Sequence, residues 1–292
     1  MQAVWSFWSK PYFERQGSTW LSHKHYLYSC VLSFECARRH FCETVLYTDD
    51  AGAELLIDEL KLPFSSVSTS LNDVNHYDSA WWAVGKLYTY SMQSAPFIHI
   101  DSDVYLWKAL PKHFQQATVI GQNPEYFQIG SSWYHPEKFD TIIASRHWLP
   151  DEIIWYREQR KKQMAVCCGI LGGSDVGFIR QYAKQALKLI DCSLTEEAYQ
   201  SLHGDNLLIE QYLLSAFINY NQQHISAKQG QCKSAYIFKS ADEAFNPDIS
   251  KQAGYTHLIG GAKCNQKLMD RLERRICNDY PEYFERINSM VL

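Results

Sequence analysis

The sequence lacks several features that would assign it to common protein classes. None of its nine cysteines forms a CxxC pair, and their spacings match no zinc module. An odd number of scattered cysteines indicates buried thiols in a reducing compartment. No apolar run is long enough to span a bilayer, and the first residues lack a basic region and a small-residue cleavage site. We therefore expect a soluble, cytoplasmic protein without a transmembrane segment.

An excess of positive charge is also missing. The chain has 28 basic and 32 acidic residues, and its longest basic run is Arg160-Lys161-Lys162. Proteins that bind nucleic acid carry a basic patch, so we expect no nucleic-acid partner. Apolar residues make up 46% of the 292 residues, which is enough for one large core. The sequence leaves the oligomeric state open.

Apolar strand-like segments alternate with segments of helical periodicity. The first half contains expected strands at 3–8, 44–48, 65–69 and 97–106, and expected helices at 20–39, 53–60 and 79–93. A further strand at 165–171 precedes helices that end near 190 and 219. This alternation predicts an α/β fold with a mostly parallel central sheet flanked by helices. Between the expected strands at 97–106 and 165–171, residues 121–163 are aromatic and aperiodic, which is typical of a binding loop or a small subdomain.

The most informative motif is the pair Asp101 and Asp103, which we expect at the carboxyl end of a buried strand. Residues two apart on a strand share a face, and buried carboxylates need a positive partner. The pair can therefore hold a hard divalent cation. Asp49 also follows a strand, where ligands of open sheets bind, although Asp49-Asp50 could equally form a helix cap and turn. His99 shares the face of the pair, and a buried histidine bonded to a neighbour is favoured over a third ligand.

Other segments carry groups that suit the same chemistry. Lys86 lies on the helix before the Asp101 strand, and Glu210-Gln211 lies on a late helix. Near the end, His257 precedes Gly260 by three residues and Lys263 by six. A histidine can complete the coordination of a Mn²⁺-like ion, a glycine lets backbone approach a phosphate, and a lysine neutralises it. Taken singly, each is better explained as a core histidine or an ordinary helix-surface residue.

In this order along the chain, the segments resemble the glycogenin-like, retaining, metal-dependent glycosyltransferases of the GT-A fold. The resemblance implies one Rossmann-like domain over residues 1–292. Residues 1–120 would form its nucleotide-binding half, and residues 121–292 its acceptor-side half with a metal- and diphosphate-binding tail. It also implies transfer of a hexose from a UDP-sugar to an acceptor of unknown kind.

The resemblance implies a role for each matching residue. The metal, Mn²⁺ or Mg²⁺, would be held by Asp101, Asp103 and His257, with Asp101 also reaching the donor ribose. The diphosphate would be held by Gly260 and Lys263, and Lys86 would face the donor. The remaining matches would surround the uracil (Ser6 and Asp49) or approach the anomeric carbon (Glu210 and Gln211).

Three departures from the family pattern leave other functions open. Cys167 stands where the family has Asn, Glu210 where it has Asp, and no Pro-Trp follows Lys263. One alternative is therefore a sugar-nucleotide-binding protein without transfer activity. Another is a metal-dependent nucleotidyltransferase or pyrophosphatase, but residues 9–12 supply no glycine-rich basic phosphate loop. Aromatic residues such as Trp81 and Trp82 could stack on sugar rings, although most are expected in the core.

Overall fold

The protein has an α/β fold, as predicted. The computed structural model describes residues 1–14, 19–130, 133–159, 163–225 and 230–290. Its central sheet has seven strands in the order β3-β2-β1-β4-β7-β6-β8, and β5 and β9 form a second, two-stranded sheet. The pairs β1–β2, β2–β3 and β6–β8 are parallel, while β6–β7 is antiparallel. The chain divides into two compact units, and the boundary passes through β4 (Phe97–Ile100).

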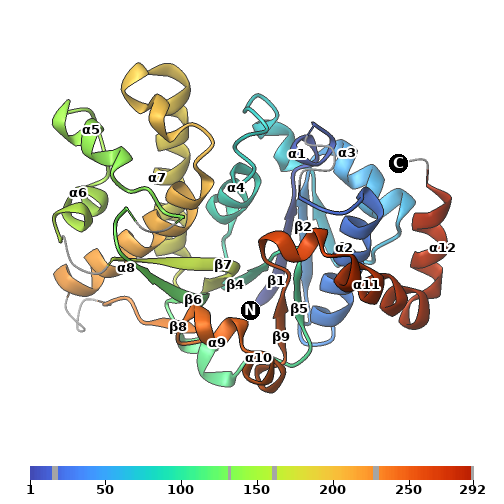
Figure 1. Ribbon diagram of the computed structural model, residues 1–292. Helices are drawn as coiled ribbons and strands as arrows, with labels where there is room; N and C mark the ends of the chain where they lie inside the picture. The colour runs from blue at the N-terminus through green and yellow to red at the C-terminus, as the bar shows by residue number, and fades with distance from the viewer. Residues whose placement is uncertain (15–18, 131–132, 160–162, 226–229, 291–292) are drawn as a thin grey trace. The chain divides into compact units, whose positions relative to one another are not determined.

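The first unit comprises Met1–Ser79, His99–Leu110 and Pro247–Leu292, so the last segment returns to the first. Its strands are β1 (Gln2–Phe7), β2 (Thr44–Thr48), β3 (Ser66–Ser68), β5 (Val104–Leu106) and β9 (Tyr255–His257). Its helices are α1 (Ser9–Glu14), α2 (His23–Ala37), α3 (Asp50–Ala53), α10 (Pro247–Ala253), α11 (Gln266–Asp279) and α12 (Pro281–Ser289). Helices α11 and α12 pack against α2 (Figure 1).

The second unit comprises Ala80–Ile98 and Pro111–Asn246. Its strands are β6 (Val119–Phe127), β7 (Gln163–Gly173) and β8 (Ser234–Tyr236). Its helices are α4 (Val84–Met92), α5 (Lys138–Ala144), α6 (Asp151–Glu158), α7 (Val176–Thr195), α8 (Leu213–His224) and α9 (Ala241–Phe245). Among the described residues, no helix combines the length and apolar character needed to cross a membrane.

Local sequence explains where the main elements begin. Ser22 caps α2 by accepting a hydrogen bond from the His25 backbone, and Asp175 caps α7 in the same way from Phe178. Strand β1 is buried because α2 covers it; the Trp5 indole donates to Ser33 Oγ on that helix at 3.0 Å. A short helix, α1, follows β1 in a stretch where no helix was predicted.

The expectation of a binding loop or a small subdomain over residues 121–163 is wrong for residues 121–127, which belong to a strand of the central sheet. Strand β6 is a core strand, and α5 and α6 follow it. Polar residues hid the strand: Gln122 and Asn123 are each 1% exposed, and the Gln122 amide donates to Asn123 Oδ1 at 3.1 Å. Buried polar side chains that bond to each other interrupt the apolar pattern from which a strand is predicted.

Candidate functional site

Asp101 and Asp103 lie in the turn between β4 and β5. Strand β4 ends at Ile100, and the Val104 amide donates to the Asp101 carbonyl at 3.0 Å to close the turn. The expectation that both carboxylates share one strand face is therefore wrong. The turn still places the pair beyond the carboxyl end of β4, where ligands of open α/β sheets bind.

His257 reaches this turn through strand pairing. Strand β9 runs antiparallel to β5 with His257 opposite Val104, and the Leu258 amide donates to the Asp103 carbonyl at 3.0 Å. One ligand atom from each of Asp101, Asp103 and His257 lies within 4.8 Å of the others. Two carboxylates and one imidazole are a donor set that Mn²⁺ and Mg²⁺ accept. The residues present thus fit a divalent cation.

Lys263 meets the same carboxylate from the other side. Its Nζ lies 2.5 Å from Asp103 Oδ2, and His257 Nε2 lies 3.3 Å from Asp103 Oδ1. Burial acts to raise the pKa of Asp103, but the charges and hydrogen bonds of Lys263 and His257 outweigh it and hold the pKa well below its usual range. Asp103 is therefore an ionised carboxylate that is kept buried by positive charge.

The turn that carries Lys263 depends on a glycine. A 3-10 helix runs from Gly260 to Cys264, and Gly260 has a φ of 53°, a left-handed conformation that favours glycine. The Leu21 amide donates to the Lys263 carbonyl at 3.0 Å, and the Trp20 ring centroid lies 5.5 Å from Lys263 Nζ. Backbone and aromatic contacts therefore position the lysine at the site.

His99 connects Ser6 to Asp101. Its Nε2 lies 2.8 Å from Ser6 Oγ, and its Nδ1 lies 3.5 Å from Asp101 Oδ1. The side chain is 1% exposed, so the interpretation of a buried histidine bonded to a neighbour is confirmed. Such a contact orients a carboxylate that faces a metal.

Asp49 is engaged within the first unit. It caps α3 by accepting from the Gly52 amide at 2.9 Å, and it also accepts from the Ser9 amide at 3.1 Å and the Ser9 hydroxyl at 2.8 Å. The cap-and-turn alternative is confirmed. Its role at a uracil remains a prediction, as does that of Ser6.

Lys86 and Glu210 form an ion pair in the second unit, which their sequence positions do not reveal. Lys86 Nζ lies 2.7 Å from Glu210 Oε1 and donates to the Cys168 carbonyl at 3.2 Å. The Glu210 side chain is 0% exposed, and among the described residues its Oε2 has no hydrogen-bond partner. Tyr90 also donates to Glu210 Oε1, at 3.4 Å. Sequence reasoning missed Tyr90, although it lies one helical turn after Lys86 on α4.

Gln211 contacts a different tyrosine. The Tyr134 hydroxyl lies 2.6 Å from Gln211 Oε1 and 2.6 Å from Glu125 Oε2, and its single proton is donated to one of these oxygens at a time. Burial, followed by the charge of Glu125, raises the pKa of Tyr134 well above its usual range, so this phenol stays protonated. Both residues of the Glu210-Gln211 pair are thus held by internal partners.

Fold and site together define an α/β protein with a candidate divalent-metal centre. The chain belongs to the family of unknown function DUF6734, which it matches over residues 1–290. No curated protein matches the sequence significantly.

Two solved structures illustrate what the chain is similar to. One is the galactosyltransferase LgtC in complex with donor and acceptor sugar analogs, at 10% identity and a TM-score of 0.44, with 100% of this chain and 97% of that chain covered. The other is the glycosyltransferase GlyE of Streptococcus pneumoniae TIGR4, at 10% identity and a TM-score of 0.45, with 99% and 63% covered. Likeness at this level assigns no activity.

Proposed function

We propose that this protein is a metal-dependent glycosyltransferase that moves a hexose from a UDP-sugar to an acceptor. The observation that supports the proposal is the cluster of Asp101, Asp103 and His257, with Lys263 paired to Asp103. These residues come from segments far apart in the sequence, in the order that the resemblance requires. Retention at the anomeric carbon is part of the proposal and is supported by the resemblance alone.

The first-unit residues would hold the donor. Asp101, Asp103 and His257 would bind Mn²⁺ or Mg²⁺, which supplies positive charge for the diphosphate that leaves the sugar. Lys263 would exchange its contact with Asp103 for one with that diphosphate. At Gly260 an added Cβ would meet no atom within 4 Å, so the backbone there is open to a phosphate. Asp101 would also contact the ribose.

By the resemblance, Glu210 and Gln211 would act on the sugar. Bond cleavage gives the sugar oxocarbenium character, which a carboxylate or amide oxygen stabilises. Glu210 and Gln211 supply such oxygens. Lys86 would balance the negative charge of Glu210 in its buried position, because a buried carboxylate needs a positive partner.

The second candidate function is a sugar-nucleotide-binding protein without transfer activity. The burial of Glu210 favours it: a side chain that is 0% exposed and paired with Lys86 at 2.7 Å contacts a sugar only after a rearrangement. In that case the metal centre would bind UDP and cation without turnover.

Release of UDP from UDP-glucose or UDP-galactose in the presence of Mn²⁺ tests both functions. The proposal expects UDP release that depends on Mn²⁺ and is lost in Asp103→Asn, while Asp58→Asn, which changes an exposed carboxylate of the same unit, behaves as wild type. If UDP and Mn²⁺ raise the melting temperature but no nucleotide sugar is turned over, the binding function is correct. If neither occurs, both are wrong.

A further inference from the structure

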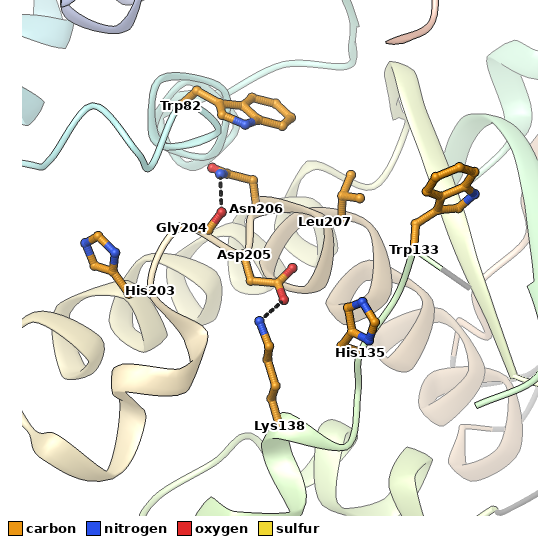
Figure 2. A pocket seen from close by; sticks show the side chains of 9 residues that line it. All are labelled: Trp82, Trp133, His135, Lys138, His203, Gly204, Asp205, Asn206 and Leu207. Carbon is orange, nitrogen blue, oxygen red and sulfur yellow. Dashed lines mark hydrogen bonds and ion pairs between the residues drawn. The ribbon is translucent and has the colours of Figure 1, made fainter. Parts of the chain in front are cut away.

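The second unit contains a pocket that is lined by none of the residues proposed to bind the metal, the donor or the transferred sugar. Its volume is about 260 Å³, and it is lined by Trp82, Trp133, His135, Lys138, His203, Gly204, Asp205, Asn206 and Leu207 (Figure 2). Pockets for drug-sized ligands span roughly 300–1,000 Å³, so this pocket suits a ligand of about one or two sugar rings.

Two tryptophans reach solvent at this pocket. Trp133 is 81% exposed and Trp82 is 37% exposed, whereas the neighbouring Trp81 is 0% exposed. In Figure 2 the side chain of Leu207 lies between the two indole rings. Covering such exposed indoles with a ligand buries apolar area, which is favourable, and their flat faces match the apolar face of a pyranose ring.

Trp82 is held in place by a buried amide. Asn206 is 4% exposed; its Oδ1 accepts from the Ala83 amide at 2.9 Å, and its Nδ2 donates to the carbonyls of Ala80 and Gly204, each at 2.8 Å. The segment that carries Trp82 is thereby fixed to the segment 204–206. A side chain with this many internal bonds is a positioning residue for Trp82.

The polar lining favours a neutral, hydroxyl-rich ligand. Lys138 is the only lysine or arginine among the nine lining residues, and its Nζ pairs with Asp205 Oδ2 at 2.7 Å. The positive charge is thus neutralised, which disfavours a phosphate or carboxylate ligand. The Asp205 carboxylate and the imidazoles of His135 and His203 offer acceptors and donors that match sugar hydroxyls.

The pocket also adjoins the buried ion pair of the same unit. Lys86 Nζ lies 6.0 Å from the Trp82 ring centroid and 2.7 Å from Glu210. A ligand on Trp82 would therefore lie near the residues proposed to act on the sugar.

We propose that this pocket binds the acceptor and that the acceptor is a neutral glycan whose terminal rings stack on Trp82 and Trp133. The proposal rests on the proposed glycosyl transfer and narrows its acceptor to carbohydrate. Transfer would form a bond between the anomeric carbon of the donor sugar and a hydroxyl oxygen of this glycan. The bond between the anomeric carbon and the diphosphate would break, UDP would depart with its electron pair, and the hydroxyl proton would pass to the departing diphosphate oxygen.

Titration of the full chain with lactose, cellobiose and maltose, without nucleotide or metal, tests the proposal by tryptophan fluorescence and saturation-transfer NMR. At least one disaccharide should bind, and Trp133→Ala should weaken that binding about tenfold, the loss expected for one aromatic contact. Phe245→Ala removes a 65% exposed aromatic of the same unit outside the pocket and should leave binding unchanged. Trp133 is too exposed for its loss to prevent folding, and circular dichroism verifies this.

Three results would overturn the acceptor proposal: no disaccharide binds, Trp133→Ala binds as well as wild type, or glucose 6-phosphate binds more tightly than the neutral sugars. The proposed function is scored separately by the rise in melting temperature with UDP and Mn²⁺, which Trp133→Ala should retain. Sugar binding without that rise contradicts the glycosyltransferase and leaves a carbohydrate-binding pocket.

Discussion

Each compact unit places a carboxylate close to a lysine among the proposed site residues, and these two pairs differ in their access to solvent. Asp103 lies 2.5 Å from Lys263, and Glu210 lies 2.7 Å from Lys86. The Lys263 side chain is 22% exposed and Asp101 beside it is 21% exposed, whereas Glu210 is 0% exposed. An ion pair therefore does not by itself mark a ligand site. The Asp103–Lys263 pair differs from the Lys86–Glu210 pair in two ways: a second carboxylate, Asp101, lies near it, and it is partly exposed to solvent.

The largest effect is expected on the free energy of unfolding, when the buried ion pair of Lys86 and Glu210 is broken. Glu210→Ala removes the carboxylate that neutralises Lys86, and loss of one partner of a buried pair costs about 3–5 kcal/mol. Urea unfolding measures the loss. Glu197→Ala, at an exposed position of the same unit, is the control. The double variant Lys86→Met/Glu210→Leu should recover most of the stability; unchanged stability in Glu210→Ala would contradict the comparison.

The next largest effect is expected on cation binding, when a residue of the candidate metal centre is changed. Asp103→Asn removes a charge that the proposed metal needs. Loss of one strong electrostatic contact at a reacting centre should lower the rate of UDP release about 100- to 1,000-fold. Mn²⁺ should also stop raising the melting temperature, while Asp58→Asn keeps that rise. An Mn²⁺ response that survives in Asp103→Asn would remove this residue from the site.

The variant Lys263→Ala should change the affinity for the nucleotide without weakening the affinity for the cation. Lys263 competes with a cation for Asp103, so the variant should bind Mn²⁺ alone at least as tightly as wild type. It should bind UDP about tenfold or more weakly, because a charge-assisted hydrogen bond contributes roughly 1.5–3 kcal/mol. Lys267→Ala, an exposed lysine four residues away, is the matched control for calorimetric titration. Equal losses of Mn²⁺ and UDP affinity would instead make Lys263 a structural residue.

The smallest effect should come from the hydrogen bond behind the site. Ser6→Ala removes the hydroxyl 2.8 Å from His99 Nε2 and leaves Asp101 less firmly oriented. Loss of such a supporting contact lowers metal affinity about tenfold. Mn²⁺ titration measures it, with Ser65→Ala on the same unit as a comparison. A variant with unchanged Mn²⁺ affinity would show that His99 does not need this bond to hold Asp101.

Much of the fold could be predicted from local patterns. Apolar runs and helical periodicity located β1, α2 and β2, and the α/β class followed from their alternation. Strand β6 could not be predicted, because its buried Gln122 and Asn123, which share a hydrogen bond, interrupt the apolar pattern. The turn at 101–103 was mistaken for strand because Val104 continues the apolar pattern directly after it.

For the candidate site, the resemblance grouped Asp101, Asp103 and His257, whose ligand atoms the structure brings within 4.8 Å of one another, but the ion pairs made by Lys263 and Lys86 were not predicted. Spacing indicated His257, Gly260 and Lys263 as a group, and strand order placed Asp101 at a carboxyl end. The sequence alone therefore determined the α/β class and a set of groups suited to a cation and a diphosphate, because periodicity and side-chain chemistry are local properties. Only the tertiary structure decided which groups meet. Pairing of β5 with β9 brought His257 to Asp103, and burial joined Lys86 to Glu210, since both contacts depend on chain segments that return from far along the sequence.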